Sequence, residues 1–128
     1  MPKRVNERRP DLLQAVIEGD LGRLKRLLAA GADPNVADNA GWTALHFAAQ
    51  RQDVDQVRAL LAAGADVDPV DDHGDTPLFR AVFTFRGSPG AIEALRAAGA
   101  DQFRRNLEGV SPRSLAKSMT DPGARVAG

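Results

Sequence analysis

Apolar residues recur along the chain with the spacing of a helix face, and this pattern repeats three times. In each repeat a Leu, Val or Ile stands seven positions before a Gly-Ala-Asp motif, and a Leu stands four positions before it. The apolar positions are Leu24 and Leu27, Val57 and Leu60, and Ile92 and Leu95. The motifs begin at Gly31, Gly64 and Gly99, at steps of 33 and 35 residues. This register predicts a chain of structural repeats, each with a helix that packs its apolar face on its neighbours.

Helix-start signals recur in the same register. Thr43, Thr76 and Ser111 each follow a glycine by two positions, and a hydroxyl at this place caps free backbone N–H groups. Proline follows two of them, where it costs no helical hydrogen bond. A second set of caps is expected at Asp20, Asp53 and Ser88. Each unit should therefore hold two short helices, and the glycine of each Gly-Ala-Asp motif should end the second helix in a left-handed conformation.

The third unit contains two additional residues, which account for the step of 35. They fall within residues 83–90, where Gly87, Pro89 and Gly90 disfavour regular structure. The insertion predicts either an elongated turn or a longer first helix.

Two segments resemble the ankyrin repeat closely: GWTALHFAA at residues 41–49 and LLAAGADVD at residues 60–68. The resemblance implies an all-α ankyrin-repeat solenoid of about three and a half helix-turn-helix units, with short loop fingers. Both ends depart from the pattern. Arg8 stands where the turn glycine is expected and Pro10 at the cap, and Arg113 replaces a leucine of the inner units. We expect the end units to act as caps, because interior units expose apolar faces that need polar ends.

This register divides the chain into consecutive segments. We expect a basic N-terminal segment, a capping unit, two full units, a terminal half-unit and a C-terminal tail. Their bounds are 1–9, 10–38, 39–71, 72–105, 106–119 and 120–128.

Composition and charge exclude several functions. There is no cysteine, so disulfides and thiolate sites are ruled out. No apolar stretch approaches the ~18 residues of a membrane span, and a cytoplasmic location without membrane contact is expected. Residues 1–10 sum to a charge of +3, residues 11–101 to −6 and residues 102–128 to +3. An acidic repeat body would repel a phosphate backbone, so nucleic acid is not an expected partner.

No arrangement of residues points to catalysis or to a cofactor. The sequence lacks a nucleophile with histidine and acid at plausible spacing, and it lacks a Gly-rich phosphate loop. Five aspartates fall within residues 66–75, but Val70 and Asp71 occupy the positions where a calcium loop needs an acid and a glycine. We therefore expect no metal site, no cofactor and no enzymatic activity.

The two histidines receive different interpretations. His46 follows Thr43 by three positions, and we expect its ring to hydrogen-bond to Thr43 or a neighbouring turn. His73 stands at a loop tip between Asp72 and Asp75, where it is expected to be exposed. There it is either a solvated turn residue or part of a binding surface.

The resemblance implies binding through the loop fingers and the exposed side of the first helices. The residues at the matching positions are Asn39, Trp42, Asp72, His73 and Asp75 in the fingers, then Gln50, Arg51, Phe83 and Phe85 on or after the first helices. Trp42 is the only tryptophan and is either an interface anchor or packed over the adjacent loop. Phe83 and Phe85 either form a partner-facing pair or cover the lengthened turn. The finger aspartates either form an acidic rim or simply suit the turns.

These inferences favour a non-catalytic protein-interaction module whose partner has a basic surface and which is a monomer when free. An immunity or inhibitor protein that blocks a toxin or enzyme is one alternative. A structural or self-assembling regulatory subunit is another. The use of Ala, Arg and Pro and the short length are typical of a bacterial protein.

Overall fold

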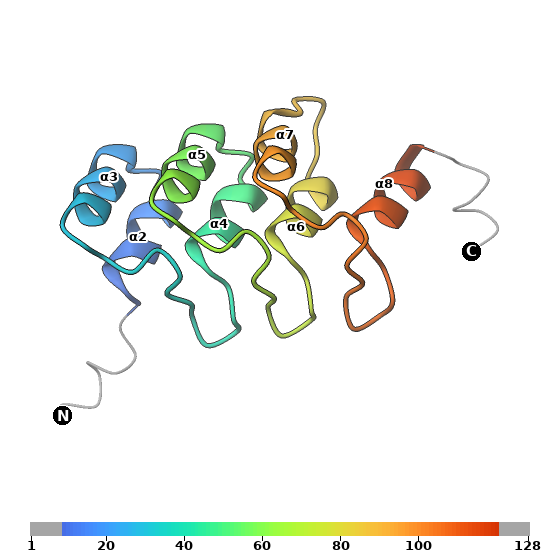
Figure 1. The fold of residues 1–128 in the computed structure, drawn as a ribbon, viewed down its shortest axis with the longest axis horizontal. Coiled ribbons are helices and arrows are strands. Elements are labelled where there is room, and N and C mark those ends of the chain that lie inside the picture. Colours follow the sequence, from blue (N-terminus) through green and yellow to red (C-terminus); the bar gives the residue numbers. More distant parts are fainter. Residues whose placement is uncertain (1–8, 121–128) are drawn as a thin grey trace.

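In the computed structural model, which describes residues 9–120, seven helices form two parallel rows. The inner row contains α2 (Asp11–Ile17), α4 (Ala44–Gln50), α6 (Pro77–Phe83) and α8 (Pro112–Thr120). The outer row contains α3 (Leu21–Ala29), α5 (Val54–Ala62) and α7 (Gly90–Ala97). Each helix packs mainly on its partner in the unit and on the next helix of its row, as Figure 1 shows. The expected all-α solenoid is confirmed.

Local capping signals place most helix starts. The hydroxyls of Thr43 and Thr76 accept from the backbone N–H three residues later, and Ser111 caps α8 in the same way. In the outer row, Asp20 and Asp53 cap α3 and α5. The expected caps are thus confirmed at these five positions.

The expectation for Ser88 is wrong. Helix α7 begins at Gly90 after Pro89, and no side chain caps it. A Cβ atom on Gly90 would lie 2.6 Å from Cγ2 of Val54 on α5. The first turn of α7 therefore packs closely on the preceding unit, where a residue larger than glycine would displace the Val54 side chain.

The outer helices end as the Gly-Ala-Asp motifs predict. Gly31, Gly64 and Gly99 have φ values of 95°, 92° and 96°. In the first unit, the N–H of Gly31 donates to the Leu28 carbonyl and the N–H of Ala32 donates to the Leu27 carbonyl. This is the Schellman arrangement, which satisfies the last carbonyls of the helix.

The two additional residues of the third unit lengthen a turn. Helices α4 and α6 have the same length of 7 residues. The connection between α4 and α5 spans residues 51–53, whereas that between α6 and α7 spans residues 84–89. Of the two expected possibilities, the elongated turn is therefore correct.

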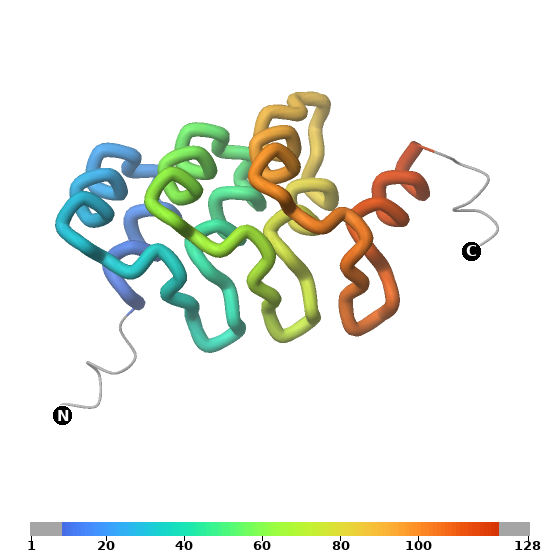
Figure 2. Tube along the Cα trace, in the orientation of Figure 1, coloured from blue at the N-terminus to red at the C-terminus, as the bar shows by residue number. Residues whose placement is uncertain are grey.

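Buried leucines from both rows of helices form much of the core. Leu13, Leu24, Leu45, Leu60, Leu78 and Leu95 are all essentially fully buried. The loops that join each outer helix to the next inner helix project together from one side of the molecule, as Figure 2 shows. We call these loops finger 1 (residues 30–43), finger 2 (63–76) and finger 3 (98–111).

Candidate functional site

Backbone hydrogen bonds tie the three fingers into one surface. The N–H of Asp72 donates to the Ala40 carbonyl at 2.9 Å, and the N–H of Leu107 donates to the His73 carbonyl at 2.9 Å. Side chains add to this linkage, since Asn35 Oδ1 accepts from the N–H of Asp66 at 2.7 Å. The fingers are therefore held in a fixed register, which suits a surface that must present side chains without prior reordering.

One Asp or Asn side chain in each finger stabilises the turn of its own loop. Asp38, Asp71 and Asn106 occupy equivalent positions, and in each the side-chain oxygen accepts two backbone N–H groups of its own finger. Asp71 is only 6% exposed. Asp71 therefore does not belong to the expected acidic rim, because its carboxylate is buried and accepts backbone N–H groups of its own finger.

Asp75 is also buried, contrary to its expected place on the outward surface. Its residue is 6% exposed. Oδ1 accepts from Asn106 Nδ2 at 2.9 Å, and Oδ2 lies 3.5 Å from a guanidinium nitrogen of Arg80. Asp75 stands just before the cap Thr76, where finger 3 covers it. It links finger 2 to its neighbours and presents little surface to a partner.

His46 connects the second and third units, as a structural residue. Its Nδ1 accepts from the Thr43 N–H at 3.1 Å, so Nε2 carries the proton and donates to the Asp75 carbonyl at 2.8 Å. Burial lowers the pKa of this imidazole below 6.5, and it outweighs the opposing effects of the Asp75 carbonyl and the Asp71 and Asp75 carboxylates. The expected hydrogen bond to Thr43 is confirmed.

Arg80 brings together side chains from two units. Its Cζ lies 5.2 Å from the ring centroid of Trp42 and 4.8 Å from that of Phe83. Its Nε donates to Gln50 Oε1 at 2.9 Å. Trp42 in turn packs on Phe47, with ring centroids 4.9 Å apart. We call Trp42, Gln50, Arg80 and Phe83 the Arg80 cluster. A guanidinium between two aromatic rings is held by cation–π attraction as well as by its hydrogen bonds.

The sequence interpretation missed Arg80. It occupies the position of Phe47 in the preceding unit. Two features of the sequence indicate its role. A cation replaces an aromatic residue of the preceding repeat, and Phe83 follows it by three residues on the same helix. The cluster exposes its aromatic edge, because Phe83 is 55% exposed while the Arg80 side chain is 17% exposed.

The remaining candidate residues fall in three places. Asn39, Asp72 and His73 are exposed at the tips of fingers 1 and 2. Arg51 lies at the turn between α4 and α5, beside Gly19, at the opposite end of the inner helices from the fingers. Phe85 is 36% exposed and lines a groove between α6, α7 and α8. Of the two alternatives for Phe83 and Phe85, the structure does not show a pair on one surface, because Phe83 lies beside Arg80 and Phe85 lines the groove.

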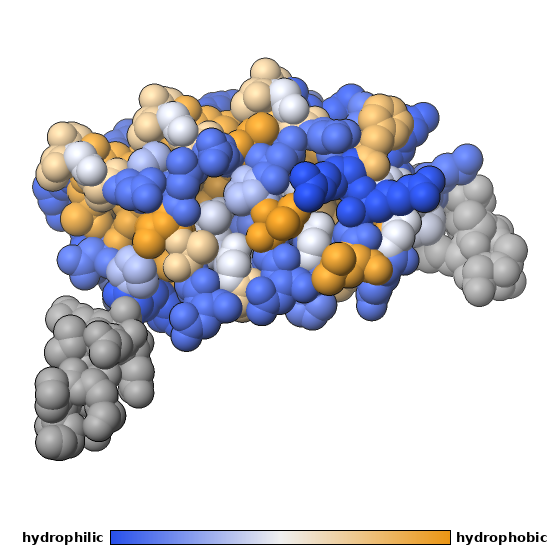
Figure 3. All heavy atoms as spheres, turned by 60° about the horizontal axis from the view of Figure 1, so that its bottom comes forward, coloured by the Kyte–Doolittle hydropathy of each residue, from blue (hydrophilic) through white to orange (hydrophobic). Residues whose placement is uncertain are grey.

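The finger side is mostly hydrophilic, with hydrophobic patches between the polar residues, as Figure 3 shows. Within this surface, possible ligand atoms of Asp71, His73 and Asp75 lie within 4.8 Å of one another. Backbone N–H groups donate to Oδ1 of Asp71, Asn106 donates to Oδ1 of Asp75, and the Arg80 cation lies beside Oδ2 of Asp75. Oδ2 of Asp71 has no hydrogen-bond partner among the described residues. The arrangement fits a braced turn better than a cation site.

Comparison with known proteins assigns this architecture. A family model described as "Ankyrin repeats (3 copies)" matches residues 12–106. The chain belongs to the ankyrin-repeat family. Ankyrin repeats indicate a protein-interaction module, and the family is generally non-catalytic. Among residues 9–120, no helix has the length and apolar character needed to cross a membrane.

Individual relatives share single stretches of repeat. Ankyrin repeat domain-containing protein 46 of Danio rerio is 57% identical over 44 residues, which are 34% of this chain and 19% of that protein. Ankyrin repeat domain-containing protein 39 of Homo sapiens is 50% identical over 36 residues, 28% of this chain and 20% of that protein. Notch-regulated ankyrin repeat-containing protein B of Danio rerio is 50% identical over 38 residues, 30% of this chain and 34% of that protein. The matches to the first two relatives span about a fifth of their length.

Proposed function

We propose that this ankyrin module binds a protein partner through the finger tips and the exposed side of α4 and α6, with the Arg80 cluster at the centre. The observation that carries the proposal is the guanidinium held between Trp42 and Phe83. Gln50 and Asp75 fix the same group by a hydrogen bond and an ion pair. Tryptophan and arginine dominate interface energetics, and side chains ordered in advance lose less entropy on binding.

A basic surface on the partner is supported by the charges of the fingers. Fingers 1 and 2 contain no Lys or Arg, and Asp33, Asp66 and Asp72 are exposed on them. Finger 3 is balanced, with Arg104 and Arg105 beside Asp101 and Glu108. A basic patch would therefore align with fingers 1 and 2. Such complementarity raises the association rate more than it raises affinity.

The experiment that tests this proposal compares two phenylalanines two residues apart. We expect a partner captured from the source organism by the wild-type chain to be lost with Phe83→Ala and retained with Phe85→Ala, because only Phe83 belongs to the Arg80 cluster. An Asp72→Ala variant should slow association in surface plasmon resonance at low salt and have little effect at high salt. Equal capture by both phenylalanine variants would show that the partner binds elsewhere.

We also propose that the free chain is a monomer and acts in the cytoplasm. Fingers 1 and 2 carry exposed aspartates and no Lys or Arg, so the proposed binding surfaces of two copies would repel each other. Light scattering should give a mass near 13.6 kDa that does not change with concentration. A mass that rises toward the dimer value would contradict this proposal.

A further inference from the structure

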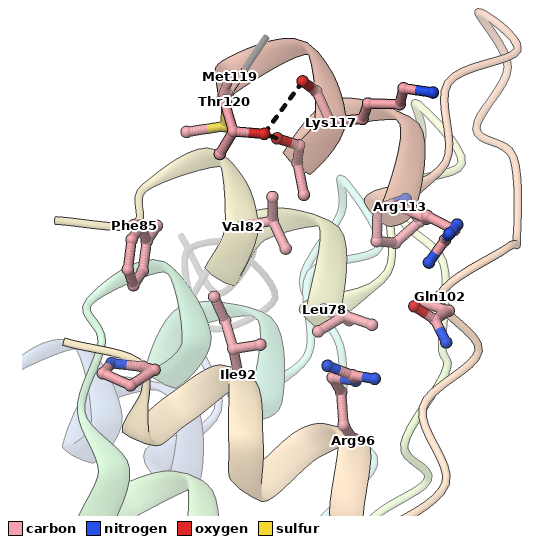
Figure 4. Close-up of a pocket in the computed structure, with 13 residues that line it drawn as sticks. Leu78, Val82, Phe85, Ile92, Arg96, Gln102, Arg113, Lys117, Met119 and Thr120 are labelled. Carbon is pink, nitrogen blue, oxygen red and sulfur yellow. Dashed lines mark hydrogen bonds between the residues drawn. The ribbon is translucent and has the colours of Figure 1, made fainter. Parts of the chain in front are cut away.

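A groove of about 600 Å³ lies at the C-terminal end of the solenoid, between α6, α7 and α8. In the preceding units every inner helix is followed by an outer helix, and the outer helices pack in series from α3 to α5 to α7. Within residues 9–120, no outer helix follows α8. The groove therefore lies beside α7 at the place where a further helix of the outer row would pack. Figure 4 shows the residues that line it.

The apolar edge of α7 is uncovered on this side. Leu24, Val57 and Ile92 occupy the same repeat position, and the first two are fully buried. Ile92 is only partly buried and lines the groove together with Val82 and Met119. This side of α7 is thus as apolar as the surfaces that are buried between inner units, but no further unit covers it among the described residues.

Three cations line the same groove at positions that are apolar earlier in the chain. Arg96 takes the place of Leu28 and Leu61, Arg113 that of Leu45 and Leu78, and Lys117 that of Ala49 and Val82. Among the residues that the structure describes, 9–120, no acidic side chain lines the groove. In Figure 4 the side chains of Arg96 and Arg113 lie near Gln102, on the side of the groove away from Phe85.

A soluble end of the solenoid does not require three cations without acidic partners, because a mixture of acidic and basic residues would also cap it. The N-terminal end has such a mixture. There Arg23 lies 3.6 Å from Asp11 and 3.5 Å from Glu18, so its charge is paired locally. Within the described part of the chain, no carboxylate lies within ion-pair distance of Arg96, Arg113 or Lys117. Among residues 9–120 these cations therefore have no acidic partner, and Cζ of Arg113 lies 5.7 Å from the ring centroid of Phe103.

We propose that this groove binds an acidic amphipathic helix of another protein, which takes the place of the missing outer helix. The apolar stripe of that helix packs on Val82, Ile92 and Met119, and its Glu or Asp residues face the three cations, in the manner of a helix in a groove. The surface is separate from the Arg80 cluster and does not depend on the function proposed above. A second copy of the chain is a poor occupant, since α3 at the other end carries Arg23, Lys25 and Arg26.

The proposal can be tested with two synthetic peptides. Both are helix-forming, about 18 residues long, with one leucine stripe, and they differ only in carrying Glu or Lys beside it. We expect the Glu peptide to shift the methyl signals of Val82, Ile92 and Met119 in NMR titrations of the full chain. We expect it to bind at least about tenfold more tightly than the Lys peptide, with an affinity that falls as salt rises.

Charge-reversed variants locate the site. The variant Arg96→Glu/Arg113→Glu should reverse the preference between the peptides, whereas the control Lys25→Glu/Arg104→Glu, with the same change in net charge, should not. Equal binding of the two peptides, or shifts centred on the fingers, would overturn the proposal.

Other occupants give different results. If neither peptide binds the full chain but the Glu peptide binds after residues 121–128 are removed, the occupant is the chain's own tail and the proposal is wrong. A concentration-dependent mass that the Arg96→Glu/Arg113→Glu variant abolishes would instead identify a second copy, and would also overturn it. The Phe83→Ala variant should lose the partner of the finger side and still bind the Glu peptide. The proposal for the fingers and the proposal for the groove can therefore fail independently.

Discussion

His46 makes the junction between the second and third units sensitive to acid. Folding lowers the pKa of the imidazole, so between the folded and unfolded pKa values the unfolded state binds more protons. The stabilisation is complete above pH ~6.5 and is lost as pH falls below it, because a proton on Nδ1 removes the acceptor for the Thr43 N–H. For a single titrating group, the free energy of unfolding cannot change by more than about 1.4 kcal/mol per pH unit.

This prediction is checked by urea unfolding of the wild type and His46→Gln between pH 7 and pH 5. The free energy of unfolding of the wild type should fall toward that of the variant as pH decreases. Comparison with the variant is needed because burial also raises the pKa of Asp68, which adds its own pH dependence. A constant difference between wild type and His46→Gln would contradict the prediction.

Arg80 depends on its planar geometry as well as its charge. Lysine at this position cannot reproduce both the stacking between Trp42 and Phe83 and the hydrogen bond to Gln50. We expect Arg80→Lys to lower the free energy of unfolding by about 1 kcal/mol. It should also change the emission of Trp42, the only tryptophan of the chain. Arg86→Lys, on the exposed turn after α6, should change neither measurement.

Single residues were predictable where their role is local. Thr43 and Thr76 could be assigned as caps because a cap contacts a backbone group three residues away. Arg80 could not be assigned, since its partner Trp42 comes from the preceding unit and only the fold brings the two together. Asp75 was misplaced for the same reason, because Asn106 of the next finger covers it.

At the scale of the elements, the fingers depend on glycine to different degrees. Gly74 and Gly109 have similar φ values, 78° and 81°. A Cβ atom on Gly74 would lie 2.9 Å from the backbone nitrogen of Leu107, whereas one on Gly109 would meet nothing within 4 Å. Alanine at Gly74 would therefore add a collision with finger 3 to the backbone strain, and would disturb the hydrogen bond from Leu107 to the His73 carbonyl.

We expect Gly109→Ala to lower the free energy of unfolding by about 1–2 kcal/mol, from the left-handed conformation alone. Gly74→Ala should cost more, about 2–4 kcal/mol, because the added contact is with backbone atoms that cannot rotate away. Denaturant unfolding of the two variants measures the difference. Equal losses would show that finger 3 moves aside without cost.

Helix α7 shows where prediction of elements fails. Ser88 followed by Pro89 has the composition of a helix start, but Pro89 is the N-cap residue, so α7 begins one residue later than expected and has no side-chain cap. A Cβ atom on Gly90 would lie 2.6 Å from Cγ2 of Val54, and such packing on the preceding unit depends on the fold and not on local preference. Neither the groove beside α7 nor its three cations could be recognised as one surface until α6, α7 and α8 were placed together.

Contacts in this molecule run along one direction, because each unit packs only on its neighbours in the chain. For this reason the repeat register alone predicted the architecture. The same linear arrangement gives residues at one repeat position different degrees of burial. Leu27 and Leu60 share one repeat position, but Leu60 is fully buried between two units while Leu27, in the first unit, is only partly buried. We expect Leu60→Ala to cost about 2–5 kcal/mol and Leu27→Ala about half as much.

Amide hydrogen exchange distinguishes the two variants further. Leu60→Ala should lower protection in α4 through α7, because the second unit couples the ends of the solenoid. Leu27→Ala should lower it mainly in α2 and α3, since opening of a terminal unit breaks only one interface. Uniform loss of protection in both variants would mean that the chain unfolds as a single cooperative unit despite its linear contacts. In that case a helix bound in the C-terminal groove would stabilise the fingers as strongly as the neighbouring α7, and the two candidate surfaces would be thermodynamically coupled.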